Sequence, residues 1–272
     1  MNGPDDDMSQ MLNDDLSTVE VQSYYVRKRN ALLVRGRFGP LYMDYYLHLM
    51  QHGLKLADDP DQMLKDALAT LALHLASRPQ DEGCAWTVNF HDPLMNLFVT
   101  GGSRPGRVTG RVFTEDVKDS GKNLFIAQTT RPHMQPRQSM IEFAGADIPA
   151  AVEQFYTQSE QRPTRVFRLP DEEFAQISAE PDADLDWLAS LTLEQIPGLG
   201  ETETLSLLET RGYIFECGCT PDRLYPLLTR LPDADLDYIF EDGFATITCP
   251  RCAAVFRAPK SAFEAWKARQ PA

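Results

Sequence analysis

Four of the five cysteines in this chain of 272 residues lie in two short clusters, a CxC cluster that begins at Cys217 and a CxxC cluster that begins at Cys249. Two pairs of thiols on facing turns are the usual way to build a closed tetrahedral zinc site. In the CxxC cluster, two thiolates can hold one ion from a tight turn. In the rarer CxC cluster the backbone must bend for both sulfurs to reach one ion, and Gly218 permits that bend. The two clusters therefore predict a bound metal ion.

Two other interpretations of the cysteines remain open. In the first, a zinc ribbon would only stabilise the fold of a small C-terminal unit. The cysteine spacing alone favours this purely structural role. A thiol oxidoreductase is less compatible with the sequence, because the CxxC of such enzymes follows a strand of a thioredoxin-like βαβ unit, whereas Cys249 lies late in a small ribbon. The fifth cysteine, Cys84, stands apart, and we expect it to be a small buried hydrophobic residue.

The composition predicts a globular intracellular protein. With 43% hydrophobic residues, the chain can bury one large core in addition to the small cysteine unit. No segment approaches the roughly eighteen apolar residues that span a bilayer, and the N-terminus lacks a signal-peptide pattern, so we expect a cytoplasmic protein without membrane partners. The net charge of −14 disfavours nucleic acid as a partner. Thiols that are kept reduced in a cytosol favour metal binding over permanent disulfides.

Hydrophobic periodicity predicts an α+β fold for the part of the chain that precedes the clusters. Apolar residues at helical spacing predict helices over 40–54 and 61–75, and Asp147 is placed to cap a third helix. Alternating or short apolar runs predict five strands, over 84–90, 94–100, 107–113, 124–130 and 139–143. Residues 1–18 are polar and acidic, which predicts a disordered arm. No nucleophile–base pair, phosphate-binding glycine loop or pair of catalytic carboxylates is found, so we do not expect an enzyme.

The excess negative charge is concentrated in one segment. From Asp171 to Thr210 the chain holds eleven Asp and Glu residues and no Lys or Arg, together with twelve large apolar residues. Because the acids repel one another, order in this segment must come from packing an apolar face on the first domain, which makes it a marginal cover. An ordinary acidic interdomain helix is the alternative. The basic cluster at 27–29 is expected to be a solvated strand or turn, and no histidine spacing predicts metal binding or catalysis.

Several segments resemble, in the same order along the chain, the redox-regulated holdase chaperones of the 33-kDa heat-shock protein family. The resemblance covers nearly the whole chain after the N-terminal arm. Its most specific parts are the two cysteine clusters at this separation and the motif Ser-Glu-Gln-x-Pro-Thr-Arg at 159–165. The other matching segments are 33–36, 92–97, 152–156 and 184–189.

This resemblance implies a division of the chain into four parts. After the arm, it implies an N-terminal client-binding sheet-and-helix domain over 19–169, an acidic helical linker over 170–212 and a zinc-binding redox-switch domain over 213–272. One part departs from the family, because the stretch at 204–213 is expected to be the remnant of a trimmed helix. A shortened linker would alter the coupling between zinc loss and exposure of the client site.

The resemblance also implies a site and an activity. One Zn²⁺ would be bound by Cys217, Cys219, Cys249 and Cys252, with disulfides Cys217–Cys219 and Cys249–Cys252 in the oxidised state and no catalytic residue. The activity would be that of an ATP-independent holdase, which captures unfolding proteins under oxidative stress after zinc release and forms a homodimer when oxidised. The alternative function is a constitutive protein-interaction module with a purely structural zinc site.

Overall fold

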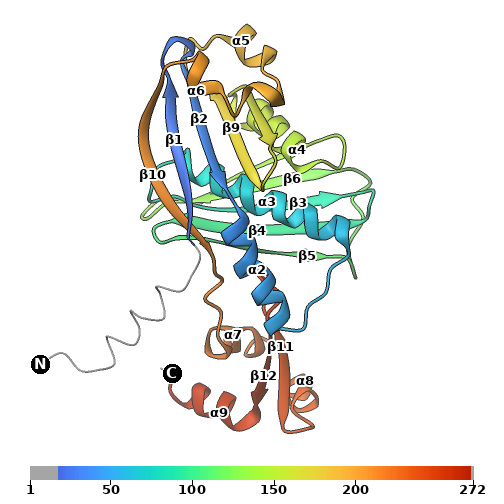
Figure 1. Ribbon diagram of the computed structural model, residues 1–272. Helices are drawn as coiled ribbons and strands as arrows, with labels where there is room; N and C mark the ends of the chain where they lie inside the picture. The colour runs from blue at the N-terminus through green and yellow to red at the C-terminus, as the bar shows by residue number, and fades with distance from the viewer. Residues whose placement is uncertain (1–17, 271–272) are drawn as a thin grey trace, which may run out of the picture.

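The computed structural model describes residues 18–270, and it has a large upper body with a small module below it (Figure 1). The predicted acidic arm lies outside the described residues, except for Thr18. The upper body is built on one ten-stranded sheet with the strand order β7-β6-β3-β4-β5-β10-β1-β2-β9-β8. Sheet and helices together confirm the α+β class.

The first half of the sheet contains the five predicted strands. They are β3 (Gly83–Phe90), β4 (Met95–Ser103), β5 (Gly106–Phe113), β6 (Leu124–Thr130) and β7 (Arg137–Glu142). In β3 every second residue is buried, as the alternation of its side chains predicts. The ring of Trp86 packs on Phe125 at 5.2 Å between centroids, and Phe125 stacks on Phe155 at 4.8 Å.

The second half of the sheet was largely missed by the sequence analysis. It consists of β10 (Leu205–Phe215), β1 (Val19–Val26), β2 (Ala31–Arg37), β9 (Glu173–Ala179) and β8 (Thr164–Arg168). The two halves join where β10 runs parallel to β5 at Ile214 and Phe215. Figure 1 shows β10 as a long strand that leads from the top of the upper body down to the module.

Three helices cover the inner face of the sheet, and all three were predicted. They are α2 (Gly39–Gln51), α3 (Asp58–Ala76) and α4 (Ile148–Phe155), with short helical turns at η1 (Arg27–Arg29) and η2 (Tyr156–Glu160). From Leu64 to its last residue, α3 is buried throughout. The side chain of Asp147 accepts a hydrogen bond from the backbone N–H of Ala150 and so caps α4 as expected.

The prediction of a helical linker over 170–212 is wrong in its secondary structure at both ends. Strand β9 occupies 173–179, and β10 replaces the helical remnant expected at 204–213. In β9, Phe174 packs in the main core while Ala175 and Ile177 pack in a second cluster, so both faces of the strand are buried. A strand buried on both faces lacks the polar alternation that identifies strands in a sequence.

Between these two strands, the acidic segment does lie on the upper body through its apolar side chains. Its short elements are α5 (Leu185–Ser190), η3 (Leu193–Gln195) and α6 (Leu199–Thr202). Leu188, Leu191 and Ile196 are buried against Leu33 and Ile177 of the sheet. We call residues 180–204 the acidic cover. Its role as a division between two domains stays a prediction.

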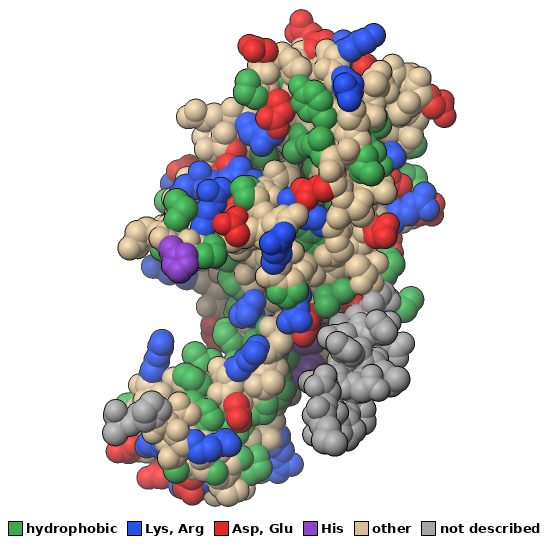
Figure 2. All heavy atoms as spheres, turned by 90° about the vertical axis from the view of Figure 1, so that its left-hand side faces the viewer, with side chains coloured by type: hydrophobic (Ala, Val, Ile, Leu, Met, Phe, Trp, Pro, Cys, Tyr) green, Lys and Arg blue, Asp and Glu red, His purple; other side chains and the backbone are tan. Residues whose placement is uncertain are grey.

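The C-terminal module, residues 217–270, is a small unit with its own core. Its elements are α7 (Pro221–Leu228), α8 (Asp233–Ile239), β11 (Phe244–Thr248), β12 (Val255–Pro259) and α9 (Lys260–Ala268). Two of the helices, α7 and α8, lie between the two cysteine clusters. The space-filling view shows a narrow waist between module and upper body (Figure 2). Within residues 18–270, no helix has the length and apolar character needed to cross a membrane.

Candidate metal centre

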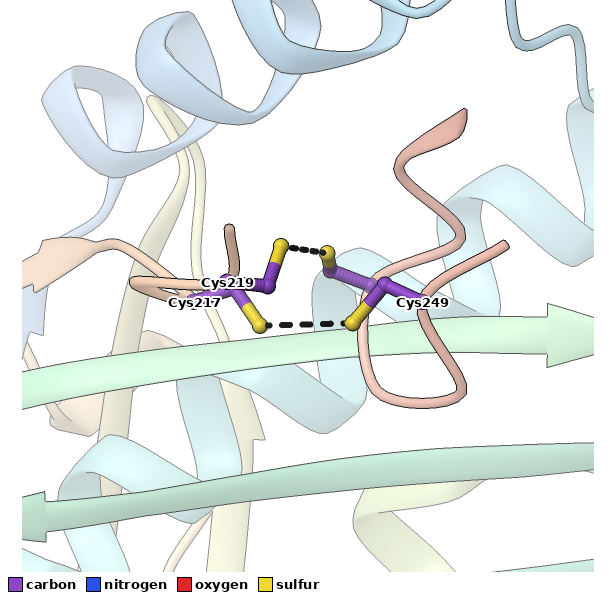
Figure 3. Close-up of side chains that lie close together, drawn as sticks. Cys217, Cys219 and Cys249 are labelled. Carbon is purple, nitrogen blue, oxygen red and sulfur yellow. Dashed lines mark hydrogen bonds between the residues drawn. The ribbon is translucent and has the colours of Figure 1, made fainter. Parts of the chain in front are cut away.

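The four clustered cysteines meet at the top of the module, close to the waist. Cys217 and Cys219 follow directly after β10, and Gly218 between them has a φ of +63°, the left-handed bend that glycine adopts without strain. Cys249 and Cys252 lie in the turn between β11 and β12, which is closed by a 2.8 Å hydrogen bond from the N–H of Cys249 to the carbonyl of Ala254. Figure 3 shows Cys217 and Cys219 facing Cys249 across the gap between the two turns.

The spacing of the sulfur atoms fits a tetrahedral metal ion. All four Sγ atoms lie within 4.8 Å of one another, with short contacts between Cys219 and Cys252 at 3.5 Å and between Cys217 and Cys249 at 3.7 Å. All four thiols are free, and these distances far exceed the S–S bond length of about 2.05 Å. Four thiolates at about 2.3 Å from one zinc ion are separated by about 3.8 Å. The donor set and its geometry therefore suit one such ion.

The pKa values of the four thiols also favour a cation in the cluster. Hydrogen bonds from the thiols of Cys217 and Cys252 lower the pKa of Cys249, and the corresponding hydrogen bonds raise the pKa of Cys252. Burial raises the pKa of Cys219 to about 12, and the hydrogen bond to Cys249 raises that of Cys217. Without a cation, the thiolate form is therefore favoured at Cys249 and disfavoured at the other three cysteines. A divalent ion removes this conflict, because it favours the charged form of all four sulfurs.

The two clusters differ in their access to solvent. Cys249 and Cys252 have exposed fractions of 1% and 2%, whereas Cys217 and Cys219 are half-buried. The half-buried pair lines a groove of about 370 Å³ between the module and α2, together with Leu47, His48 and Phe256. Solvent and small solutes therefore reach the cluster from the CxC side.

Two side chains of the upper body bind the backbone of the CxxC turn, and the sequence analysis did not identify either. The Nε2 atom of His48, from α2, lies 2.9 Å from the carbonyl oxygen of Cys252. The Nη1 atom of Arg111, from β5, donates to the carbonyl oxygen of Cys249 at 3.1 Å. The turn that supplies two sulfurs is thus held through its carbonyl groups by two elements of the sheet domain.

A second set of contacts surrounds these anchors. His52, one helical turn after His48, has its Nδ1 atom 3.2 Å from the carbonyl oxygen of Val255. The ring of Phe215 lies 5.3 Å from that of His48 and 5.5 Å from that of Tyr45. The i, i+4 spacing of the two histidines was the only local signal of this interface, because it places both rings on one face of the helix.

The basic cluster at 27–29 holds the acidic cover and is not simply a solvated turn. The guanidinium of Arg29 forms ion pairs with Asp184 at 2.6 Å and with Glu203 at 2.9 Å, one near each end of the cover. The same guanidinium lies over the ring of Trp187 at 5.5 Å. The remaining cysteine, Cys84, has an exposed fraction of 4%, and burial raises its pKa to about 12, in keeping with the predicted inert core residue.

The chain is similar to known proteins in both sequence and structure. The family model described as Hsp33 protein matches residues 47–179 and 168–258. The 33 kDa chaperonin of Enterobacter sp. (strain 638) is 28% identical over 195 residues, which cover 59% of this chain and 67% of that protein. The 33 kDa chaperonin of Escherichia coli (strain K12 / DH10B) is 29% identical over the same shares.

Among solved structures, the crystal structure of the 33 kDa chaperonin from Thermotoga maritima is similar to this chain with a TM-score of 0.69. The alignment covers 92% of this chain and 97% of that protein at 14% sequence identity. At that identity the match shows a shared fold, which includes the large sheet and the module.

Proposed function

The chain belongs to the Hsp33 family, and from this premise we propose that it is a chaperone whose four clustered thiols bind Zn²⁺ in the resting state and are oxidised to activate it. The observation that carries the proposal is the set of four free Sγ atoms within 4.8 Å of one another at the junction of module and upper body. Free thiols of this kind suit a reducing cytoplasm.

In the resting state the site has a structural role. When bound, zinc supplies a charge that keeps four sulfurs deprotonated and links two turns that the small core of the module joins only weakly. The chain's own residues add the rest: His48 and Arg111 hold the CxxC turn, and β10 leads from the acidic cover directly into the CxC turn. Folding of the module, the end of β10 and the cover are therefore connected along one stretch of chain.

Activation begins with oxidation of the thiols by a peroxide. For each pair of thiolates, one S–S bond forms and the O–O bond of one hydrogen peroxide breaks; the peroxide accepts two electrons from the sulfurs and two protons from solvent and leaves as two waters. Two peroxides convert all four thiols. We propose the pairs Cys217–Cys219 and Cys249–Cys252, and disulfide mapping by mass spectrometry tests them, because short sulfur contacts in the folded module also join opposite clusters.

Oxidation removes the donor set, so the ion leaves and the module loses the cross-link between its two turns. Once the module unfolds, the chain after β10 no longer helps to keep the acidic cover in place. The acids of the cover repel one another, and only its short elements pack on the upper body. Apolar surface becomes available to unfolding client proteins, without ATP, and to a second oxidised copy of the chain as a homodimer.

The test compares ligand variants with a cysteine control. We expect Cys217→Ser and Cys249→Ser to lower zinc retention and to suppress citrate-synthase aggregation without peroxide. Cys84→Ala removes a buried thiol outside the cluster and should behave as the unaltered chain. If the ligand variants lose zinc and protect no client in any redox state, the site is structural, and the chain is an interaction module without a redox switch.

A further inference from the structure

Helix α2 carries an apolar face that nothing in the described part of the chain covers. Met43, Tyr46, Leu47 and Met50 have exposed fractions of 61%, 41%, 48% and 77%. They follow the i, i+3, i+4, i+7 spacing of a single helical stripe. A stripe of this kind is normally buried, and contiguous exposed apolar side chains mark interaction sites. We call these four residues the α2 face.

The α2 face continues into the interface between upper body and module. Leu47 lines the groove that also contains His48, Phe215 and Phe256. Of these, Phe215 is only 5% exposed, and the ring of Phe256 lies 5.5 Å from that of His52. Figure 1 shows α2 descending from the sheet to the module, so one helix carries both the free face and the contact with the module.

The two sides of α2 respond differently to loss of the module. The α2 face is exposed while the module is docked, whereas the side with His48 and His52 is occupied by the carbonyl groups of Cys252 and Val255. Departure of the module uncovers this second side together with Phe215. Release of the module therefore adds this second side to the α2 face, while Leu41, Tyr42 and Tyr45 stay buried against the upper body.

The chemistry of the α2 face suits a ligand without a fixed sequence. Two of its four side chains are methionines, which are unbranched, polarizable and able to repack around different partners. Its one hydroxyl, that of Tyr46, already donates to Asp61 at 2.9 Å, so the face offers no free polar group for specific recognition. Because the α2 face offers only apolar contacts, it favours ligands with exposed hydrophobic segments.

We propose that the α2 face binds apolar segments of unfolded polypeptides and is the part of the client surface that is exposed while the module is docked. This inference rests on the proposed chaperone function and deepens it, since it names the surface and the chemistry of the ligand. Docking of the module limits that surface to one stripe, and release of the module widens it around the same helix.

The experiment compares two pairs of methionines in the full chain. The variant M43Q/M50Q makes the α2 face polar with a residue that is similar in size and favourable in helices. The control M134Q/M140Q alters two methionines that are each 62% exposed but lie far from α2 in the fold, near and on β7. A thiol-selective oxidant replaces peroxide, because peroxide also converts exposed methionine to its sulfoxide.

The probe is fluorescein-labelled α-lactalbumin that has been reduced and carboxymethylated, and binding is followed by fluorescence anisotropy in the reduced, zinc-free and oxidised states. We expect about tenfold weaker binding by M43Q/M50Q, because the bound probe would bury part of both exposed methionines, and less than about a twofold change in the control. Zinc content and circular dichroism check that both variants fold.

The outcomes separate this inference from the function on which it rests. If the unaltered chain binds the probe and M43Q/M50Q binds it equally well, the α2 face is not the client surface, although the chaperone function stands. If the unaltered chain binds no unfolded protein in any state, both fail. If the α2 variant abolishes self-association instead, the face is a contact between two copies of the chain. A photo-crosslinking residue at position 50 or 140 gives an independent readout: only position 50 should capture the probe.

Discussion

The contact between His48 and the CxxC turn is expected to set how fast the cluster reacts with oxidant. His48→Ala removes a hydrogen bond of 2.9 Å to the carbonyl of Cys252 and a ring contact of 5.3 Å with Phe215. The hydrogen bond is worth about 1 kcal/mol, whereas Phe215 belongs to β10 in the upper body, so its ring contact with His48 does not cross the interface with the module. The hydrogen bond therefore stabilises the docked module by about 1 kcal/mol, which corresponds to about a fivefold change in its opening equilibrium.

The sulfur of Cys252 belongs to a residue that is 2% exposed, so oxidation of the CxxC turn requires local opening. When opening and closing are fast, the rate of reaction follows the population of the open form. We therefore expect zinc release from His48→Ala to be about fivefold faster at low, fixed peroxide, measured with a colorimetric chelator. Amide hydrogen exchange in the CxxC turn should rise by a similar factor.

His91→Ala is the matched control, because His91 is an exposed histidine whose Nδ1 pairs with Asp119 at 2.7 Å, away from the module. Equal release rates for both variants and the unaltered chain would show that the docked module does not protect the CxxC turn. An increase in hydrogen exchange without faster release would show that oxidant enters through the groove beside Cys217 and not through opening.

Three further predictions follow from other parts of the structure. Arg29→Met removes the ion pairs with Asp184 and Glu203, so hydrogen exchange in the acidic cover should accelerate while β2 is unchanged; unchanged exchange in the cover would mean that its apolar packing suffices. Burial lowers the pKa of His74 from 6.5 to about 3, so between these values the unfolded chain binds a proton that the folded chain does not, and stability falls as pH falls below 6.5. The free energy of unfolding, measured with urea, should fall between pH 7.5 and pH 5.0 by about 2 kcal/mol more for the unaltered chain than for His74→Gln. An equal fall in both proteins would contradict this pKa. Chelation of zinc from the reduced chain should unfold the module and leave the sheet intact, because the metal supplies about 10 kcal/mol in comparable peptides; amide protection that persists in β11 and β12 would contradict this dependence.

Local sequence patterns were sufficient to predict the elements whose side chains alternate or repeat regularly along the chain. The strands from β3 to β7 were predicted because one face of each is less buried and their side chains alternate. The site was predicted for a similar reason: a CxC and a CxxC cluster specify four sulfur ligands before any tertiary contact is known. Gly218 adopts the positive φ that the CxC bend required.

The remaining features depend on contacts between distant parts of the chain. The family resemblance led us to expect the remnant of a helix at 204–213, but pairing with β1 across nearly two hundred residues decides its conformation, as Val19 lies opposite Tyr213. The roles of His48 and Arg111 were invisible because both bind backbone carbonyl groups, which leave no signature in the residues bound. Arg29 looked like a solvated cation because its acidic partners lie more than 150 positions away.

The central claim is that one zinc ion held by four thiols keeps a chaperone inactive. It is tested most directly by titrating the reduced, zinc-loaded chain with peroxide and measuring, in each sample, zinc released and citrate-synthase aggregation suppressed. We expect both to rise together, to reach a plateau after two peroxides per chain and to reverse when thiol reductant and zinc are restored. Zinc that stays bound as protection rises, or that leaves completely without any gain in protection, would contradict it.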